Sequence, residues 1–267
     1  MILRASVCRI VGWTKMQIVQ VSDIHIGESY FKQDVFDILV DEINNKLKPD
    51  AIVVTGDLTD EGLLYQFEHA YAEISRFNCS NIIVLAGNHD YRHTGYLLLK
   101  KLFPSPKDIY EFDDDVVLLT ISTARPDRDE GEVGYRQNLW MEKAMGKYDH
   151  KTKIVAMHHH LIGIPDTGTD KNVVFDAGDT LRACFQSKVN LVLCGHKHRP
   201  WVWRLGALDI AYAGTASSSR FRGFFECSYN IIDIKNGKSN VDIKIVGGKR
   251  FPLSDLVERY QPYFESS

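Results

Sequence analysis

Short hydrophobic runs alternate with amphipathic stretches along the first half of the chain. The runs at 17–22, 51–54 and 81–86 are rich in β-branched residues and end abruptly, which is typical of buried strands. Between them, apolar residues recur at helical spacing over 35–47 and 63–74. Strand, helix, strand, helix and strand in this order predict a mostly parallel sheet covered by helices.

The second half repeats this alternation before its character changes. Strand-like runs lie at 116–122, 153–157 and 190–194, and helical stretches lie at 136–145 and after Asp176 or Asp179. Beyond residue 200, Gly and Asn turns separate the strand-like runs, which predicts a second, more antiparallel sheet. Since no Pro-rich or Ser-rich linker and no repeat marks a boundary, we expect one α/β domain over 16–250.

The two ends of the chain differ from the rest. Residues 1–15 are basic and acid-free, but Arg4 and Arg9 interrupt any apolar centre of a signal peptide. We expect this segment to be a non-native or disordered leader, with translation beginning at Met16. The segment 251–267 predicts a C-terminal helix or tail, which either covers the second sheet or meets a second subunit in a homodimer.

Composition and charge exclude several classes of protein. The 267 residues are 44% hydrophobic and 25% charged, and no apolar run approaches the ~20 residues of a membrane span. A net charge of −3 provides no general attraction for a nucleic-acid polymer. Five widely spaced cysteines without a CxxC pair argue against a disulfide framework and a zinc knuckle, and they favour a reducing, cytoplasmic compartment.

Polar residues able to bind metal directly follow five of the predicted strands. They are Asp23 and His25, then Asp57, then Asn88, His89 and Asp90, then His158, His159 and His160, and finally His196 and His198. The carboxyl ends of the strands in an open α/β sheet meet at one rim, so we expect these loops to converge at one rim of one sheet.

Each cluster alone has a simpler interpretation. A single Asp after a strand is usually a cap or turn residue, and a single His near the core usually has a structural role. That interpretation does not explain five repetitions of a strand followed by an oxygen or nitrogen ligand. We therefore interpret the set as a metal site.

The number and type of these ligands predict a pair of ions. Seven donors exceed the needs of one ion, and imidazole with carboxylate but no thiolate favours Mn, Fe, Zn, Co or Ni. Two dications about 3.5–4 Å apart repel each other, and a shared carboxylate offsets that repulsion. Asp57, which follows Gly56, is the expected bridge. With Asp23 as the other carboxylate, the site keeps a positive surplus that suits a hydroxide and a phosphate oxygen.

The five clusters together resemble the motif set of the calcineurin-like metallophosphoesterases, which is D-x-H, G-D, G-N-H-[DE], a strand-end H and G-H-x-H. They stand here at 23–25, 56–57, 87–90, His158 and 195–198, in the family's order. The resemblance covers about residues 17–200. It implies two mixed β-sheets packed as a central sandwich flanked by helices, a four-layer α/β/β/α fold, and it implies phosphoester hydrolysis.

The resemblance also implies a role for each matching residue. The first ion is expected on Asp23, His25, Asp57 and His198, and the second on Asp57, Asn88, His158 and His196. His89 matches a catalytic histidine that is not a ligand but contacts the substrate phosphate or protonates the leaving oxygen. Asp90 is expected to orient a histidine or the backbone, and His159 to support the site or face the substrate. His160 stands where relatives often carry proline, and its role is open.

Within the family, the chain most resembles the cyclic-nucleotide and glycerophosphodiester phosphodiesterases. Its size and the segments "SDIHIG" and "MHHHLIGIP" are similar to that branch, although the double proline of the branch's M-H-H-P-P segment is missing. The branch implies that a hydroxide made available by two metal ions attacks the phosphorus of a small phosphodiester. Arg92, Arg220 and Arg222 are either phosphate contacts or solvated surface residues.

Three other functions stay open. A phosphomonoesterase or broad-specificity phosphatase would use the same ions. A nuclease is less favoured, because no basic domain and no aromatic stacking platform stands out. A non-catalytic scaffold of the same fold is also less favoured, because such relatives lose metal ligands and this chain has the full set.

Overall fold

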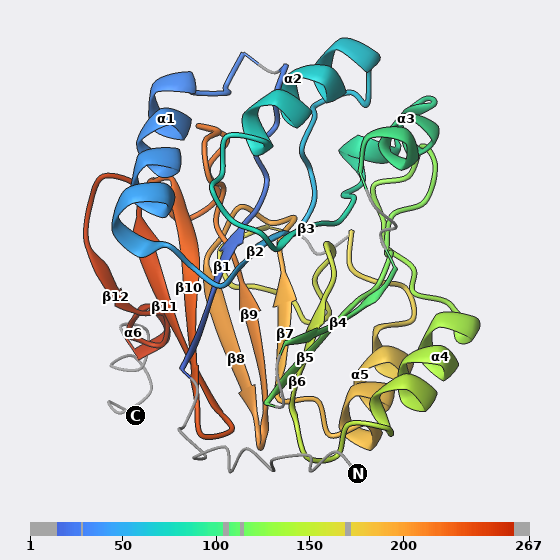
Figure 1. The fold of residues 1–267 in the computed structure, drawn as a ribbon. Helices are drawn as coiled ribbons and strands as arrows, with labels where there is room; N and C mark the ends of the chain where they lie inside the picture. The colour runs from blue at the N-terminus through green and yellow to red at the C-terminus, as the bar shows by residue number, and fades with distance from the viewer. Residues whose placement is uncertain (1–14, 28, 104–106, 113–114, 169–171, 259–267) are drawn as a thin grey trace, which may run out of the picture.

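Two six-stranded mixed sheets packed face to face form the centre of the computed structural model, and helices lie outside them (Figure 1). The structure describes residues 15–27, 29–103, 107–112, 115–168 and 172–258. This arrangement confirms the fold class predicted from the sequence.

The first sheet has parallel strands on one side and antiparallel strands on the other. In spatial order its strands are β12 (Arg250–Pro252), β11 (Lys238–Ile245), β10 (Ser228–Lys235), β1 (Met16–Val21), β2 (Ala51–Val54) and β3 (Ile82–Val84). The strands β1, β2 and β3 run parallel, whereas β10, β11 and β12 pair antiparallel.

The second sheet has a parallel centre and antiparallel edges. In spatial order its strands are β4 (Ile109–Phe112), β5 (Val116–Thr120), β6 (Thr152–Ala156), β7 (Leu191–Cys194), β9 (Leu208–Tyr212) and β8 (Trp201–Leu205). The four central strands are parallel, and β4 and β8 are the antiparallel edges.

Two expectations about the sheets are wrong. The strands beyond residue 200 do not form a sheet of their own, because β8 and β9 extend the second sheet while β10, β11 and β12 extend the first. The five strands that precede the polar clusters also do not share one sheet, because β6 and β7 lie in the second. Hydrophobic periodicity reports that a strand is buried but not which strand lies beside it.

The helices cover the two sheets from outside. On the first sheet lie α1 (Gln33–Asp41), which continues as the π-helical turn η1 (Glu42–Leu47), α2 (Leu64–Ile74) and α3 (Gly95–Leu102). On the second lie α4 (Tyr135–Met145) and α5 (Ala177–Gln186), which are side by side at the lower right of Figure 1. The hydrophobic pattern predicts four of these five helices and misses α3.

The C-terminal segment only partly follows its prediction. Phe251 and Pro252 belong to β12 rather than to a helix, and a single helical turn, α6 (Asp255–Glu258), follows. The rest of the predicted C-terminal helix and residues 1–14 of the predicted leader lie outside the described residues.

Three hydrophobic clusters fill the three interfaces between the four layers. Successive side chains of a strand point to opposite faces, so Val19 packs toward the helices with Phe36, whereas Ile18 packs between the sheets with Leu118. The third cluster, which includes Val155, lies between the second sheet and its helices. The two sheets are therefore fixed to each other by a mainly hydrophobic interface, which also fixes the loops at their ends.

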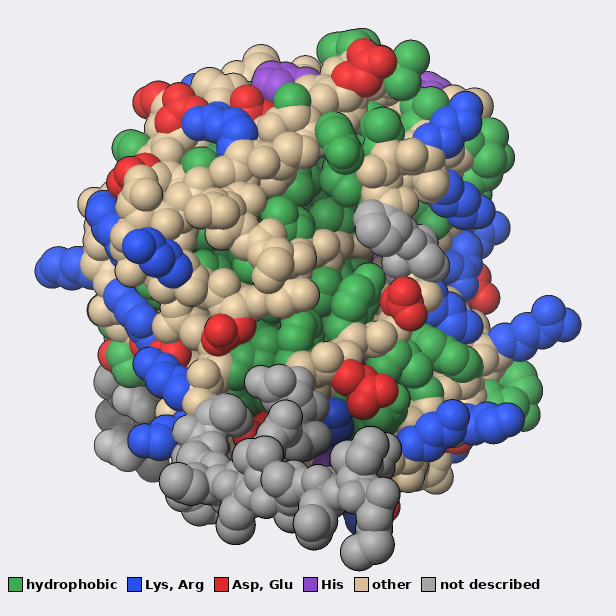
Figure 2. All heavy atoms as spheres, viewed as in Figure 1, with side chains coloured by type: hydrophobic (Ala, Val, Ile, Leu, Met, Phe, Trp, Pro, Cys, Tyr) green, Lys and Arg blue, Asp and Glu red, His purple; other side chains and the backbone are tan. Residues whose placement is uncertain are grey.

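The surface shows neither a membrane-spanning helix among the described residues nor, on the face in Figure 2, a continuous basic strip. None of the described helices has the length and apolar character needed to cross a membrane. Figure 2 shows that lysine and arginine side chains lie mainly at the margins of one face, with hydrophobic and uncharged atoms between them. On this face the basic charge is therefore divided rather than gathered into one strip.

Candidate metal centre and active site

Side chains from five loops meet at one end of both sheets. Asp23 and His25 follow β1, Asp57 follows β2, Asn88 follows β3, His158 follows β6, and His196 and His198 follow β7. Five of these residues have a left-handed backbone: Asp23 (φ 53°), His25 (54°), Asp57 (53°), His196 (74°) and His198 (52°). A left-handed residue other than glycine costs on the order of 1–3 kcal/mol, so the surrounding structure must hold these turns in place.

Backbone contacts between the loops hold the turns. The N–H of His25 donates to the carbonyl of Asp57 at 3.0 Å, and the N–H of Gly195 donates to the carbonyl of His158 at 2.9 Å. At Gly87 a Cβ would lie 2.0 Å from Asp57 Oδ1. Only glycine therefore lets the loop after β3 approach Asp57 this closely.

The first group of ligand atoms comes from Asp23, His25, Asp57 and His198, all of which are buried. His25 Nε2 lies 2.9 Å from His198 Nε2 and 3.7 Å from Asp57 Oδ2. His198 Nε2 lies 3.4 Å from Asp23 Oδ1. The four residues expected at the first ion are thus brought together.

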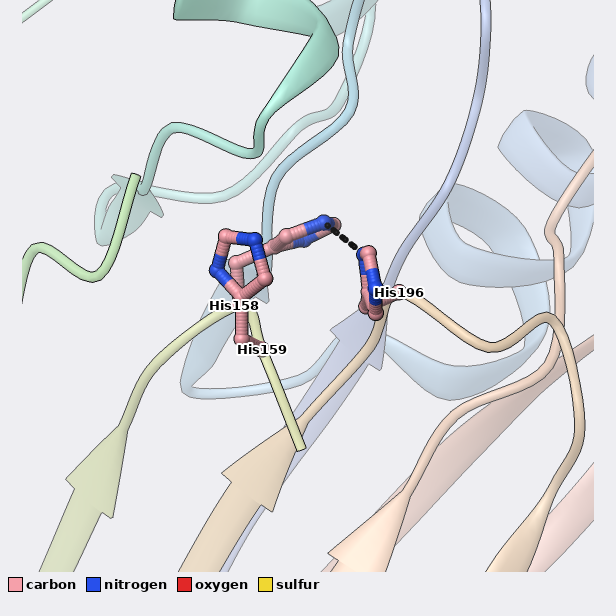
Figure 3. A group of neighbouring side chains, drawn as sticks. All are labelled: His158, His159 and His196. Atoms are coloured by element: carbon pink, nitrogen blue, oxygen red, sulfur yellow. Dashed lines mark hydrogen bonds between the residues drawn. The ribbon is translucent and has the colours of Figure 1, made fainter. Parts of the chain in front are cut away.

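The second group comes from Asp57, Asn88, His158 and His196. His158 Nε2 lies 3.4 Å from Asp57 Oδ2 and 3.2 Å from Asn88 Oδ1. His196 Nδ1 lies 3.0 Å from Asn88 Oδ1 and 3.3 Å from His158 Nε2, which is the contact drawn as a dashed line in Figure 3. The four residues expected at the second ion are also brought together.

One carboxylate oxygen belongs to both groups. Asp57 Oδ2 lies within 3.7 Å of His25 Nε2 and within 3.4 Å of His158 Nε2, whereas Asp57 Oδ1 accepts a hydrogen bond from the N–H of His89 at 3.0 Å. Burial raises the pKa of Asp57, but His158, His89 and His25 lower it by more, to well below its usual range. Asp57 is therefore an ionised carboxylate that faces two sites.

These spacings fit transition-metal ions. Bonds of about 2.0–2.2 Å place neighbouring ligand atoms about 3–3.5 Å apart around an ion. Most distances within the two groups lie in or near that interval, and the ligands are buried oxygen and nitrogen atoms without thiolate. Two neighbouring sites for divalent ions therefore suit the residues that are present.

Comparison with known proteins places the chain in a family. A model of the calcineurin-like phosphoesterases matches residues 16–200, which is more than half of the chain. The chain belongs to the calcineurin-like phosphoesterase family. The resemblance inferred from the five motifs is thereby confirmed, and members of this family use divalent metal ions.

Named relatives and a solved structure agree with this assignment. A probable cyclic nucleotide phosphodiesterase of Xenorhabdus bovienii is 24% identical over 241 residues, which cover 82% of this phosphoesterase and 95% of the relative. A probable glycerophosphodiester phosphodiesterase, GpdQ, of Arcobacter nitrofigilis is 28% identical over 204 residues, covering 69% and 72% of the two chains. Purple acid phosphatase PPD1 from yellow lupin shares the fold, with a TM-score of 0.70 and 13% identity over 90% of this chain and 53% of that one.

In this phosphoesterase, outer contacts fix two of the histidines so that their Nε2 atoms face the ligand groups. His158 Nδ1 donates to the carbonyl of Thr55 at 2.7 Å, and His198 Nδ1 donates to the carbonyl of Arg220 at 2.6 Å. A ring whose Nδ1 carries the proton presents its Nε2 as the metal ligand. Burial, followed by neighbouring histidines, lowers the pKa of His25 and His196 well below its usual value, so both rings are neutral.

Metal affinity is expected to fall at low pH. Burial lowers the pKa of His158, but Asp57 raises it by more, to about 9, so at neutral pH the metal-free protein holds a proton on Nε2. Displacing one proton predicts about a tenfold weaker affinity for each pH unit below that pKa. Calorimetric titration with Mn²⁺ in buffers of different ionisation enthalpy measures the released proton, and binding without proton release would contradict this assignment.

Asp90 connects two of the loops through their backbones. Its carboxylate accepts hydrogen bonds from the N–H groups of Leu58 at 3.1 Å, Thr59 at 2.9 Å and Gly87 at 2.9 Å. Burial and the charge of Asp57 raise the pKa of Asp90 to about 6, although these N–H groups lower it. Of the two roles expected for Asp90, the structure places it against the backbone.

His159 and His160 lie behind the ligand groups. Both ring nitrogens of His159 have protein partners, since Nδ1 lies 2.7 Å from Thr123 Oγ1 and Nε2 donates to the carbonyl of Asp129 at 3.2 Å. Its ring lies 4.6 Å from that of His196 (Figure 3), and the ring of His160 stacks on His196 at 5.4 Å. His158, His159 and His196 each offer a ring nitrogen within 4.8 Å of the others, so His159 could bind metal only by giving up one of its two protein partners.

His89 faces a small polar cavity beside the ligand groups. His89 Nδ1 donates to the carbonyl of Asp60 at 2.6 Å and lies 3.3 Å from the Asp60 carboxylate. Burial lowers the pKa of His89, but Asp57 and Asp60 raise it to about 9. Asp60 is not among the residues predicted from the sequence, although its place in "GDLTDEG", three residues after Asp57, is a signal that points to it.

The cavity has a volume of about 270 Å³ and is bounded mainly by polar side chains. Arg92, Arg220 and Arg222 line it together with His89, so all three arginines that are candidates for phosphate contact lie at the site. Arg92 also pairs with Glu61 at 2.7 Å. The cavity therefore offers positive charge beside the ligand groups.

Proposed function

We propose that this member of the calcineurin-like phosphoesterase family hydrolyses small phosphodiesters with a pair of divalent transition-metal ions. The observation that carries the proposal is the position of Asp57 Oδ2, which lies against imidazole nitrogens of two separate ligand groups. A carboxylate in that position offsets the repulsion between two neighbouring dications.

Seven residues would hold the two ions. Asp23, His25, Asp57 and His198 would bind the first, and Asp57, Asn88, His158 and His196 would bind the second. When bound, such a pair supplies an activated water and positive charge for the phosphoryl oxygens. The buried histidines and the carboxylate would hold this charge beside the cavity that Asp57, Asn88 and His89 line.

His89 would supply a proton to the leaving oxygen. Its Nδ1 is committed to Asp60, so the proton available to a substrate is on Nε2. The raised pKa of His89 favours the protonated ring at neutral pH, which is the form that can donate. Arg92 Nη2 lies 3.4 Å from His89 Nε2, so a phosphate oxygen held by Arg92 would lie near the same proton.

The names of the relatives support a phosphodiester substrate. The two described above are a probable cyclic nucleotide phosphodiesterase and a probable glycerophosphodiester phosphodiesterase, and each matches most of its own length. The small cavity fits a small substrate better than a polymer.

The assay that tests the proposal compares a diester with a monoester. Protein loaded with Mn²⁺ is expected to hydrolyse bis(p-nitrophenyl) phosphate with a higher kcat/KM than p-nitrophenyl phosphate, and a chelator should remove both activities. A panel of 3′,5′-cyclic nucleotides, 2′,3′-cyclic nucleotides and glycerophosphodiesters then narrows the substrate. A higher kcat/KM for the monoester would overturn the proposal of a diesterase. Metal-loaded protein without activity toward either compound would overturn the proposal of an enzyme.

A further inference from the structure

We infer that Asp129 is a positioning residue for the second metal site, because its carboxylate sets which end of the Asn88 amide faces that site. Asp129 lies in the loop between β5 and α4 and belongs to none of the five motifs. The inference rests on the proposed function only in taking the group around Asn88 as a metal site.

The two ends of the Asn88 amide have different neighbours. Asn88 Oδ1 lies 3.0 Å from His196 Nδ1 and 3.2 Å from His158 Nε2, so it points into the second ligand group. Asn88 Nδ2 points away and donates to Asp129 Oδ1 at 3.2 Å. Only the oxygen of an amide can bind a cation, whereas its NH₂ group only donates. A carboxylate only accepts, so Asp129 selects the orientation with the oxygen toward the ion.

Asp129 is itself held in place without help from Asn88. Its carbonyl accepts a hydrogen bond from His159 Nε2 at 3.2 Å. Two residues further on, a Cβ at Gly131 would lie 2.6 Å from Cγ of His159, so the loop backbone packs directly on the imidazole. The Asp129 side chain is 58% exposed, and Arg92 Nη2 lies 3.7 Å from its Oδ1.

Asp129 contacts residues of the second ligand group or next to it, and not those of the first. Its side chain meets Asn88, a member of the second group, and its carbonyl meets His159, whose ring lies 4.6 Å from that of His196. Among the described contacts, none joins Asp129 to His25 or His198 of the first group. Loss of the carboxylate should therefore weaken one metal site selectively.

The expected loss of metal affinity can be taken from other metal sites at which a hydrogen-bond partner of a ligand residue is removed. Without Asp129, the Asn88 NH₂ group loses its described acceptor, and only the contacts of Oδ1 with His158 and His196 hold the amide in this orientation. Removing an outer hydrogen-bond partner of a metal ligand typically costs about 10–100-fold in metal affinity. We expect Asp129→Ala to weaken the second Mn²⁺ site by about that factor and to leave the first unchanged.

Titration of the metal-free full chain with Mn²⁺ tests this directly, using calorimetry to resolve two affinities in wild type and in three variants. Asp129→Ala removes the acceptor, and Asp129→Asn keeps an acceptor oxygen but removes the charge. Glu130→Ala removes a charge from the adjacent position, and Glu130 makes no described contact with Asn88. Only Asp129→Ala should weaken the second site by that factor, Asp129→Asn should retain most of its affinity, and Glu130→Ala should match wild type.

The other outcomes overturn the inference. Two wild-type affinities in Asp129→Ala would show that the carboxylate does not position Asn88, and equal losses in Glu130→Ala would show a general charge effect. Wild-type protein that binds a single Mn²⁺ would also overturn it. If wild type binds two ions but hydrolyses no phosphoester, the proposed function fails while the titration still decides the role of Asp129. Thermal unfolding of each metal-free variant checks that all four proteins are folded.

Discussion

Replacing Asp57 by alanine is expected to remove the paired metal site and to reduce kcat toward bis(p-nitrophenyl) phosphate by about 10³-fold or more. Asp57 Oδ2 is the atom that both ligand groups share, and no other described carboxylate lies between His25 and His158 in the same way. A metal pair provides several kcal/mol of transition-state stabilisation, and about 4 kcal/mol corresponds to this factor.

Two further variants make the result specific. Asp57→Asn keeps the size of the side chain but removes the charge, so it should also lose activity and bind fewer ions. Asp179→Ala removes a 70% exposed carboxylate from α5 whose described partner is Arg182, and it should leave metal content and kcat unchanged. Full activity of Asp57→Ala with two bound ions would contradict the bridging role.

Replacing His89 by asparagine is expected to slow hydrolysis by an amount that depends on the leaving group. Loss of a general acid typically costs about 10²–10⁴-fold, and this loss should appear with glycerophosphodiesters, whose alkoxide leaves poorly without a proton. With bis(p-nitrophenyl) phosphate the loss should be much smaller, because p-nitrophenolate leaves without protonation. Metal content should stay at the wild-type level, since the His89 backbone N–H that holds Asp57 Oδ1 remains.

The pH dependence of activity tests proton donation by His89 independently. Asp57 and Asp60 raise the pKa of His89 to about 9 against the effect of burial, and a general acid acts only while it is protonated. Activity toward an alkyl diester should therefore fall as the pH rises through the pKa of His89. Bound divalent ions repel the protonated His89 ring and therefore lower its pKa. The fall in activity, the alkaline limb of the pH profile, should then lie below pH 9. The limb should vanish in His89→Asn and persist in His69→Asn, a change of a half-exposed histidine on α2.

An equal loss with both classes of leaving group would contradict proton donation by His89. Such a result would leave His89 as a contact for the substrate phosphate, which is the other role that the family resemblance implies.

The meeting of the candidate ligand residues could be predicted from the sequence because the signal is local. Each donor lies within four residues of the end of a buried strand, as Asp57 does after β2 and His196 after β7. Strand ends of parallel units gather at one end of a sheet, so a set of such donors predicts convergence without any knowledge of the topology.

The arrangement of the strands could not be predicted in the same way. Placement of β10, β11 and β12 beside β1 depends on pairing over more than 200 residues of sequence, as between Met16 and Ile234. The hydrophobic pattern of these strands does not choose between the sheets, because β10 is buried like the strands of both, whereas β11 and β12 are largely half-buried or exposed. The prediction of a separate antiparallel sheet therefore agrees with the hydrophobic pattern of each strand but not with the way the strands pair.

The residues that support the candidate ligands also could not be predicted from the sequence. Asp129 meets Asn88 across 41 residues, and its loop shows no hydrophobic period that would place it. The left-handed backbone of His25 and His198 is also invisible in the sequence, since it depends on contacts between loops such as that of the His25 N–H with the carbonyl of Asp57. Local chemistry thus predicts which side chains meet, while their support depends on long-range packing.

The proposed function requires two adjacent ions that share Asp57. Anomalous diffraction from crystals of the Mn²⁺-loaded protein would locate them. We expect two peaks about 3.5–4 Å apart, one on each side of Asp57 Oδ2. A single peak, or two peaks with no carboxylate of Asp57 between them, would contradict this expectation.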